Sequence, residues 1–186
     1  MSLLDALPMS RKQLLSIVQS EARINVWEGS VRSGKTIASL LRWLIYVADA
    51  PRGGELVMVG RTRDSLFRNI IGPLMNPELF GELAGLVKYN NGAPMAYILG
   101  RPVHVLGAND AKAEPKVRGM TCTGAYVDEL TTLPPHVLRS ACRPVLRQGL
   151  EDLRDDQPRQ PRALGAPRIP QAGRGRAPAV VALHPR

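Results

Sequence analysis

The chain has 186 residues and a mass of 20.3 kDa, which suffices for one full-sized domain but not for two large ones. Apolar residues make up 44% of the sequence and charged residues 22%, a balance typical of globular rather than disordered proteins. No segment reaches the ~18–20 uninterrupted apolar residues of a membrane helix, and the N-terminus lacks the pattern of a secretory leader. Two cysteines make no disulfide framework, so the sequence indicates a soluble cytosolic protein.

The net charge of +9 is concentrated toward the end of the chain. Residues 1–137 contain 15 Lys and Arg against 12 Asp and Glu, whereas residues 138–186 contain 10 Arg, no Lys and 4 acidic residues. The second stretch also holds seven prolines and no aromatic residue. Because the composition changes abruptly near Val137, the basic balance of the whole chain is weak evidence for nucleic-acid binding.

Helical and strand patterns alternate over the first 137 residues. Apolar residues recur with helical spacing over 11–20, 36–48 and 63–75. Ser10 is the expected N-cap of the first helix, and Gly72 and Pro73 are expected to end the third helix early. Strand patterns occupy 24–27, 56–59, 103–106 and 125–127, and Asn90-Asn91-Gly92 is typical of a hairpin turn. This alternation predicts an α/β fold with a mainly parallel sheet and helices on both faces.

A phosphate-loop motif, G-x-x-x-x-G-K-[ST], stands between the first expected strand and the helix that follows it. It reads Gly29-Ser30-Val31-Arg32-Ser33-Gly34-Lys35-Thr36. The two glycines let the backbone wrap around a di- or triphosphate and aim its N–H groups inward. Lys35 is expected to reach the β- and γ-phosphates, and Thr36 to offer its hydroxyl to Mg²⁺ at a helix N-terminus that favours anions. The motif therefore predicts a nucleotide site with a magnesium ion.

Two adjacent acidic residues, Asp128 and Glu129, follow the apolar strand pattern at 125–127. The carboxyl ends of strands are where ligands bind in open α/β sheets. Beside a phosphate loop, Asp128 is expected to hold the magnesium shell and Glu129 to polarise the attacking water as a general base. The pair favours hydrolysis over phosphoryl transfer to a small molecule, because a kinase has no need to activate water.

Three further side chains are candidates for the same site. Arg32, inside the loop, is placed to fold over the γ-phosphate, where charge builds up in the transition state. Arg118 precedes the second motif and is a candidate to reach the nucleotide of a neighbouring subunit. Gln13 precedes the first strand, where its amide is a candidate partner for the adenine edge. For each of the three, an exposed side chain without a role in the site is the alternative.

The order of these motifs resembles the ATPase domain of the large terminase subunits of tailed phages, and within that family the branch found in Gram-positive phages and prophages. The resemblance covers about residues 10–137. The segments that carry it are 24–36, 101–110 (Arg-Pro-Val-His-Val-Leu-Gly-Ala-Asn-Asp), 117–121 (Val-Arg-Gly-Met-Thr) and 124–129 (Gly-Ala-Tyr-Val-Asp-Glu). It implies a P-loop NTPase fold of the helicase-like type, with ATP and Mg²⁺ as cofactors.

The resemblance also implies a function and a set of partners. Such proteins are ATP-driven motors that move double-stranded DNA into a procapsid. They act as a homo-oligomeric ring at the portal protein, work with a small terminase subunit, and carry a C-terminal nuclease domain. For this chain the implied location is the host cytoplasm, away from any membrane.

The chain departs from the family after about residue 137. Family members continue with a Thr-Thr-Asn-Pro-like coupling segment and then a nuclease domain rich in metal-binding acids, and neither is present here. When residues 150–161 are back-translated with GC-rich codons and shifted by one base, they read Ser-Lys-Ile-Phe-Ala-Thr-Thr-Asn-Pro-Asp-Ser. The hypothesis is a frameshift near residues 133–139. It divides the chain into two parts. Residues 1–137 are a partial P-loop ATPase domain with its C-terminal strands missing, and residues 138–186 are an Arg/Pro-rich tail that is out of frame or disordered.

Two other classes of protein remain as alternatives. One is a different phosphate-loop enzyme, such as a helicase-like ATPase or a kinase. The other is a non-catalytic, basic nucleic-acid-binding protein whose Arg-rich tail is genuine.

Overall fold

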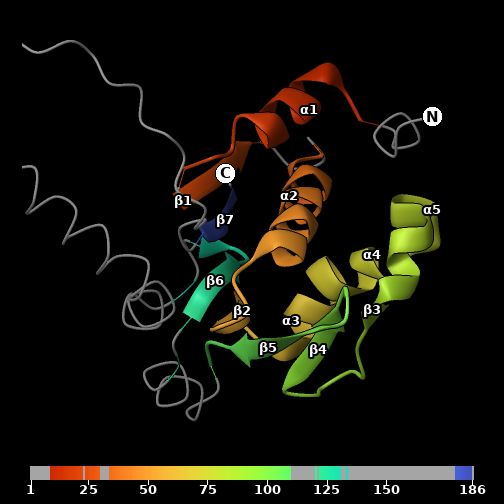
Figure 1. The fold of residues 1–186 in the computed structure, drawn as a ribbon, viewed down its shortest axis with the longest axis vertical. Coiled ribbons are helices and arrows are strands. Elements are labelled where there is room, and N and C mark those ends of the chain that lie inside the picture. The colour runs from red at the N-terminus through yellow and green to blue at the C-terminus, as the bar shows by residue number, and fades with distance from the viewer. Residues whose placement is uncertain are drawn as a thin grey trace, which may run out of the picture.

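The computed structural model describes residues 9–22, 24–29, 34–109, 120, 122–130, 133 and 179–185, with the backbone alone for 28, 29 and 179–185. These residues form a seven-stranded sheet with helices packed on one face (Figure 1). The strand order is β1-β7-β6-β2-β5-β4-β3. The described part of the chain is therefore an α/β fold, as the sequence predicts, but the described helices cover one face of the sheet and not the two that were expected.

Five neighbouring strands of the sheet run parallel. They are β1 (Ile24–Gly29), β7 (Ala179–Pro185), β6 (Cys122–Val127), β2 (Glu55–Gly60) and β5 (Arg101–Gly107). Two short strands, β4 (Met95–Ile98) and β3 (Val87–Lys88), extend the sheet in antiparallel fashion beyond β5. The turn between β3 and β4 contains Gly92 at a φ of +82°, which fits the hairpin expected at Asn90-Asn91-Gly92.

The described helices are α1 (Arg11–Val18), α2 (Lys35–Asp49), α3 (Arg63–Leu66), the π-helical turn η1 (Phe67–Ile71), α4 (Gly72–Leu74), α5 (Pro77–Phe80) and the 3₁₀ helix η2 (Gly81–Leu86). Gly72 and Pro73 do not end the helix that begins at Arg63. The helix passes through them by widening into η1, because a proline cannot donate the hydrogen bond that an α-helix needs.

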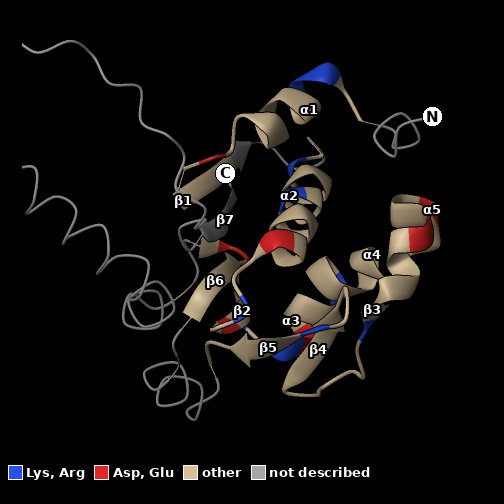
Figure 2. Cartoon of the chain, in the orientation of Figure 1, with Lys and Arg blue, Asp and Glu red and all other residues tan. Residues whose placement is uncertain are grey.

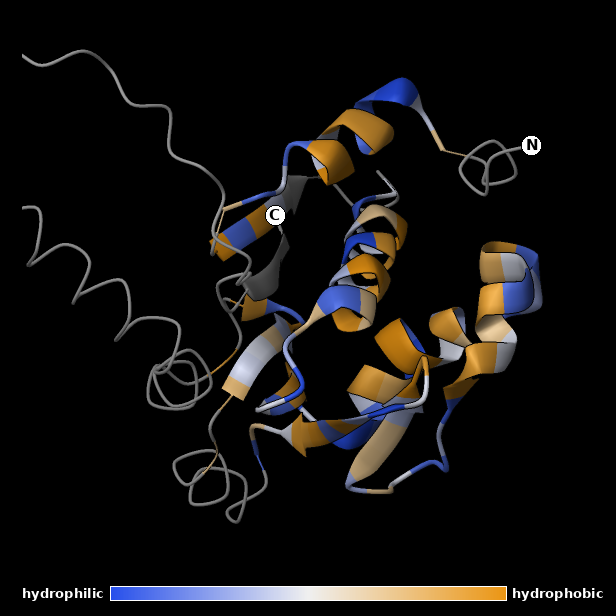
Figure 3. Cartoon of the chain, in the orientation of Figure 1, coloured by the Kyte–Doolittle hydropathy of each residue, from blue (hydrophilic) through white to orange (hydrophobic). Residues whose placement is uncertain are grey.

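Side chains of β2 alternate between two hydrophobic clusters on opposite faces of the sheet. Leu56 and Met58 belong to the larger cluster, which also contains the buried residues of the helices. Val57 and Val59 belong to a smaller cluster on the other face. The strand is thus buried on both sides, which explains why its sequence is continuously apolar rather than alternating. Figure 3 shows apolar residues on β5 and α2 as well, interrupted there by hydrophilic ones.

Several charged side chains lie on the outside of this layered core. Figure 2 shows basic residues at the start of α1, where Arg11 and Lys12 are exposed, and acidic residues on α5 and at the end of α2. Within the described residues, no helix is long and apolar enough to cross a membrane.

Strand β7 is the main difference from the sequence-based expectation, which placed no strand in residues 138–186. Its backbone pairs in parallel with β1, from Ile24↔Val180 to Gly29↔Pro185, and with β6, from Gly124↔Ala179 to Val127↔Ala182. Residues 179–183 read Ala-Val-Val-Ala-Leu, a continuous apolar run that suits a central parallel strand. The arginine and proline content of the surrounding tail concealed this short run.

Deleting residues 179–186 tests the place of β7 in the sheet. The deletion removes the strand with which β1 pairs and leaves β1 and β6 with open edges, so the free energy of unfolding is expected to fall by about 3 kcal/mol or more. Urea denaturation of the shortened and full chains measures the difference. Deleting Arg186 alone is the matched control, and equal stability of all three proteins would contradict the pairing.

Candidate nucleotide-binding site

The start of α2 and the acidic pair follow two parallel strands of the sheet, β1 and β6. Strands β1 and β6 are parallel and separated only by β7, so about 10 Å of sheet lies between them. The register places Val26 and Val127 at the same level, since both pair with Ala182. The residues that follow the two strands therefore share the carboxyl edge, where α/β sheets bind ligands.

The second glycine of the phosphate loop, Gly34, precedes α2 in a left-handed conformation with a φ of +74°. A side chain here would be strained, and a Cβ would overlap the amide of Gln13. Both the backbone angle and the close approach require glycine at this position. Lys35 and Thr36 follow as the first two residues of α2, and both are half-buried.

Gln13 lies against the phosphate loop because α1 is capped and docked there. Its side-chain Oε1 accepts a hydrogen bond from the backbone N–H of Ser10 at 2.7 Å, and Ser10 Oγ accepts from the Gln13 N–H at 3.3 Å, which together form a capping box. Trp27 of β1 donates to Ser16 Oγ at 3.3 Å and ties α1 to the sheet. The structure therefore brings Gln13 to Gly34.

Helix α2 packs on β6 through aromatic side chains. The rings of Trp43 and Tyr46 stack with centroids 5.8 Å apart, and Trp43 lies 5.9 Å from Tyr126 of β6. Ser39 Oγ and the Tyr126 hydroxyl are hydrogen-bonded at 3.0 Å, and the Tyr46 hydroxyl donates to the carbonyl oxygen of Thr123. These contacts fix the helix that follows the phosphate loop against the strand that ends in the acidic pair.

Asp128 is a buried carboxyl, with 5% of its surface exposed. Its backbone N–H donates to the Val59 carbonyl oxygen at 2.8 Å, and its Oδ2 accepts from Asn69 Nδ2 at 3.3 Å. Burial raises the pKa of Asp128 to about 6; the Asn69 hydrogen bond opposes this rise, and the neighbouring Glu129 charge adds to it. A carboxylate that water does not solvate well is a favourable ligand for a cation.

Glu129 has a φ of +50°, in the left-handed region that residues other than glycine rarely adopt. Such a conformation costs on the order of 1 kcal/mol or more and is found most often at functional sites. The side chain is half-buried at the same edge as Asp128.

Part of the expected site lies outside the described residues, namely Ser30, Val31, Arg32, Ser33 and Arg118. Of the expected magnesium ligands, Thr36 and Asp128 lie at the same edge of the sheet. One hydroxyl and one carboxylate fit Mg²⁺, which takes few protein oxygens and keeps water and phosphate as its other ligands. Among the described residues there is no cluster of three His, Cys, Asp or Glu that would form a metal site by itself.

Sequence reasoning missed Asn69. Its contact with Asp128 joins positions 59 residues apart and depends on the π-helical turn, which the helical spacing of the sequence does not reveal.

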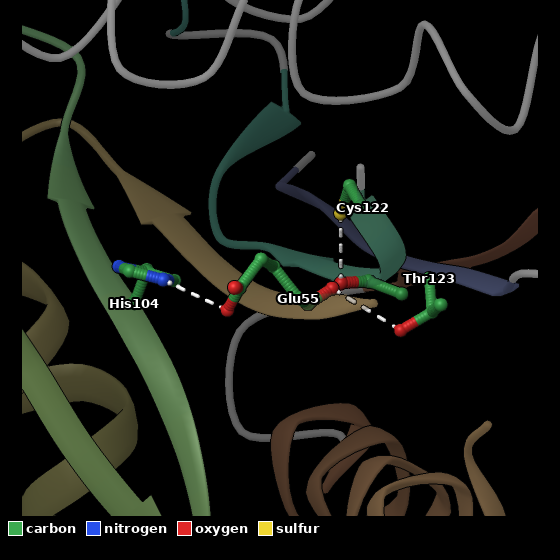
Figure 4. Close-up of polar contacts among 5 residues, drawn as sticks. Glu55, His104, Cys122 and Thr123 are labelled. Atoms are coloured by element: carbon green, nitrogen blue, oxygen red, sulfur yellow. Dashed lines mark hydrogen bonds and ion pairs between the residues drawn. The ribbon is translucent and has the colours of Figure 1, made fainter. Parts of the chain in front are cut away.

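A second group of polar contacts surrounds Glu55, away from the carboxyl edge of the sheet (Figure 4). His104 Nε2 is 3.0 Å from Oε2 of Glu55, the first residue of β2, and Thr123 Oγ1 donates to the Glu55 carbonyl oxygen at 3.2 Å. Glu55 and Thr123 stand near the beginnings of β2 and β6, away from the acidic pair at the other end of these strands. A shallow pocket of about 320 Å³ lined by Leu86 and Tyr97 also lies elsewhere, on the antiparallel end of the sheet.

A mainly parallel sheet with a phosphate-loop motif between its first strand and the next helix, and with a carboxylate pair after another strand, is typical of the P-loop NTPases. A family model described as "Terminase large subunit, T4likevirus-type, N-terminal" matches residues 26–152. The chain therefore belongs to this terminase family.

Solved structures agree with this fold. The chain is similar to the large terminase from a thermophilic bacteriophage, with a TM-score of 0.63 and 19% identity over 95% of this chain and 39% of that protein. It is also similar to the same terminase in complex with ADP, with a TM-score of 0.57 and 24% identity over 74% of this chain and 36% of that one. For the complex with ATP-gamma-S the TM-score is 0.56, with 24% identity over 74% of this chain and 35% of that one. The chain thus spans less than two fifths of these proteins. No curated protein matches it.

Gly124→Ala tests the packing of α2 on β6. A Cβ at Gly124 would overlap the Tyr46 ring, so the variant is expected to lose about 1–3 kcal/mol of stability, measured by urea denaturation. Gly53→Ala is the matched control, because a Cβ there meets nothing within 4 Å. Equal stability of the two variants would contradict the packing.

Asp128→Asn tests the burial of the carboxyl. Because the folded state holds the Asp128 proton up to about pH 6, ionisation costs stability as the pH rises from ~4 to above 6. Without magnesium, the variant is expected to be more stable than the wild type at pH 7.5, by up to about 3 kcal/mol, and the difference should vanish toward pH 4. Denaturation at both pH values measures this effect. The exposed Asp64→Asn is the control and should show no gain at pH 7.5.

Proposed function

We propose that the chain is the ATPase motor portion of a phage large terminase, which hydrolyses ATP to drive double-stranded DNA into procapsids. The observation that carries the proposal is that β1, which α2 follows in the chain, and β6, which the Asp128–Glu129 pair follows, are parallel strands separated only by β7. The structures of the thermophilic phage terminase with ADP and ATP-gamma-S support ATP as the nucleotide.

Each side chain has a distinct role in this proposal. The N–H groups of residues 29–34 surround the phosphates, and Lys35 neutralises the β- and γ-phosphate oxygens. The Thr36 hydroxyl and Asp128 hold the magnesium ion, which supplies further neutralisation of the developing charge when it is bound. Glu129 accepts the proton of the attacking water.

Three more side chains complete the proposed site. Arg32 stabilises the charge on the γ-phosphoryl oxygens from within the loop, and Arg118 does so at the nucleotide of a neighbouring subunit. Gln13 pairs with the adenine edge. Its capping box and its contact with Gly34 support this role, because they fix the side chain beside the loop.

The proposed partners follow from the terminase family. They are double-stranded DNA, the portal protein, the small subunit and further copies of the chain in a ring. The proposed location of this assembly is the cytoplasm of the host. Residues 1–137 form the partial ATPase domain, and a frameshift near residues 133–139 produced the Arg/Pro-rich tail at 138–186, of which β7 nevertheless pairs with the sheet. Sequencing the gene tests the frameshift, since an intact terminase frame must continue one base away.

Lys35→Ala tests the proposed nucleotide site. Loss of the lysine charge is expected to weaken ATP and ADP binding at least about tenfold, because no other group replaces its contact with the β- and γ-phosphates. Titration with a fluorescent ADP analogue measures the affinity. Lys88→Ala, an exposed lysine on β3 far from the loop, is the control and should bind like the wild type. An unchanged affinity in Lys35→Ala would remove the assignment of the loop.

A further inference from the structure

The side chain of Asn69 links the helix after β2 to the acidic pair after β6. Asn69 Nδ2 donates a hydrogen bond to Asp128 Oδ2 at 3.3 Å. The two strands are direct neighbours in the sheet, and Asp128 is anchored by its N–H to the Val59 carbonyl oxygen. Asn69 therefore meets a carboxyl whose backbone is already fixed, and its hydrogen bond restrains only the orientation of the carboxylate.

The π-helical turn η1 accounts for the position of Asn69. In a regular α-helix, the ring of Pro73 would clash with the carbonyl oxygen of the residue four positions earlier, which is Asn69. The helix avoids this clash by widening, so that the N–H of Gly72 donates to the carbonyl oxygen of Phe67, five residues earlier. A Cβ on Gly72 would lie 3.0 Å from that oxygen, so glycine suits this wide turn.

The widened turn keeps the apolar residues inward and Asn69 outward. The side chains that face the core are completely buried, namely Leu66, Ile70, Ile71 and Leu74. Asn69 is exposed apart from its contact with Asp128. The amide of Asn69 therefore adds little to the packing of the core. Single π-helical turns within helices are common at functional sites, so the wide turn also points to a role for Asn69 outside the core.

We propose that Asn69 is a positioning residue that orients the Asp128 carboxylate for the magnesium ion of the bound nucleotide. The inference rests on the proposed function, which makes Asp128 a magnesium ligand. The amide donates to Oδ2 and so fixes the plane in which the carboxylate presents its oxygens. Partners that orient a metal ligand in this way typically change metal affinity 10–100-fold when they are removed.

The test compares metal binding and nucleotide binding in the full 186-residue chain. Mn²⁺ replaces Mg²⁺, and the EPR signal of free Mn²⁺ measures its affinity for the ADP-loaded protein. A fluorescent ADP analogue in EDTA measures the affinity for the nucleotide without metal. The variants are Asn69→Ala, Asn69→Gln, which keeps the amide, and Asn91→Ala as an exposed asparagine far from the site.

Asn69→Ala is expected to bind Mn²⁺ at least about tenfold more weakly, with unchanged ADP affinity in EDTA and an unchanged melting temperature. Asn69→Gln should recover part of the Mn²⁺ affinity, and Asn91→Ala should match the wild type. Wild-type Mn²⁺ affinity in Asn69→Ala, or an equal loss of ADP affinity in EDTA, would overturn the positioning role.

Two further variants separate this inference from the function on which it rests. If Lys35→Ala weakens nucleotide binding and Asp128→Ala weakens Mn²⁺ binding while Asn69→Ala does neither, only the role of Asn69 fails. If Asp128→Ala leaves Mn²⁺ binding intact, or the wild-type chain binds no nucleotide, the proposed site fails and the role of Asn69 fails with it.

Discussion

The packing of α2 on β6 is the contact on which the rest of the site depends. Tyr46 lies over Gly124, where any side chain would overlap its ring, and Ser39 bonds to the Tyr126 hydroxyl within the core. Helix α2 begins directly after the phosphate loop, and β6 ends directly before Asp128. A shift of the helix along the strand would therefore move the start of α2 away from the acidic pair. The core thus sets the distance between the two halves of the site.

The parts of the fold set by short-range patterns could be predicted from the sequence. The strands at 24–27, 56–59, 103–106 and 125–127 are found as parts of β1, β2, β5 and β6. In β2, burial on both faces imposes a continuous apolar run, whereas in β1 exposed and buried residues alternate. The positions of Gly34 before α2 and of the acids after β6 followed from the neighbouring helix and strand patterns. Strand β7 and the Asn69 contact could not be predicted, because one depends on pairing with a strand far away in the sequence and the other on a wide helical turn.

The carboxyl edge of the sheet carries features that work against the stability of the fold. Asp128 is buried with a pKa of about 6, and Glu129 adopts a left-handed conformation that favours glycine. Neither feature serves the packing of the core, since a neutral side chain at 128 and a glycine at 129 would fold with less strain. Two adjacent acids carry these local costs, at the edge to which the proposed function assigns the chemistry.

The position of β7 has a consequence for how the chain acquires its structure. Strand β1 leaves the ribosome about 150 residues before the strand that pairs with it, β7. Strand β1 can join the sheet only after β7 has been synthesised, and contacts between such distant segments form slowly because a long loop must close first. Until then, β1 has an unpaired edge on the nascent chain, which makes this period the one in which misfolding and chaperone binding are most expected.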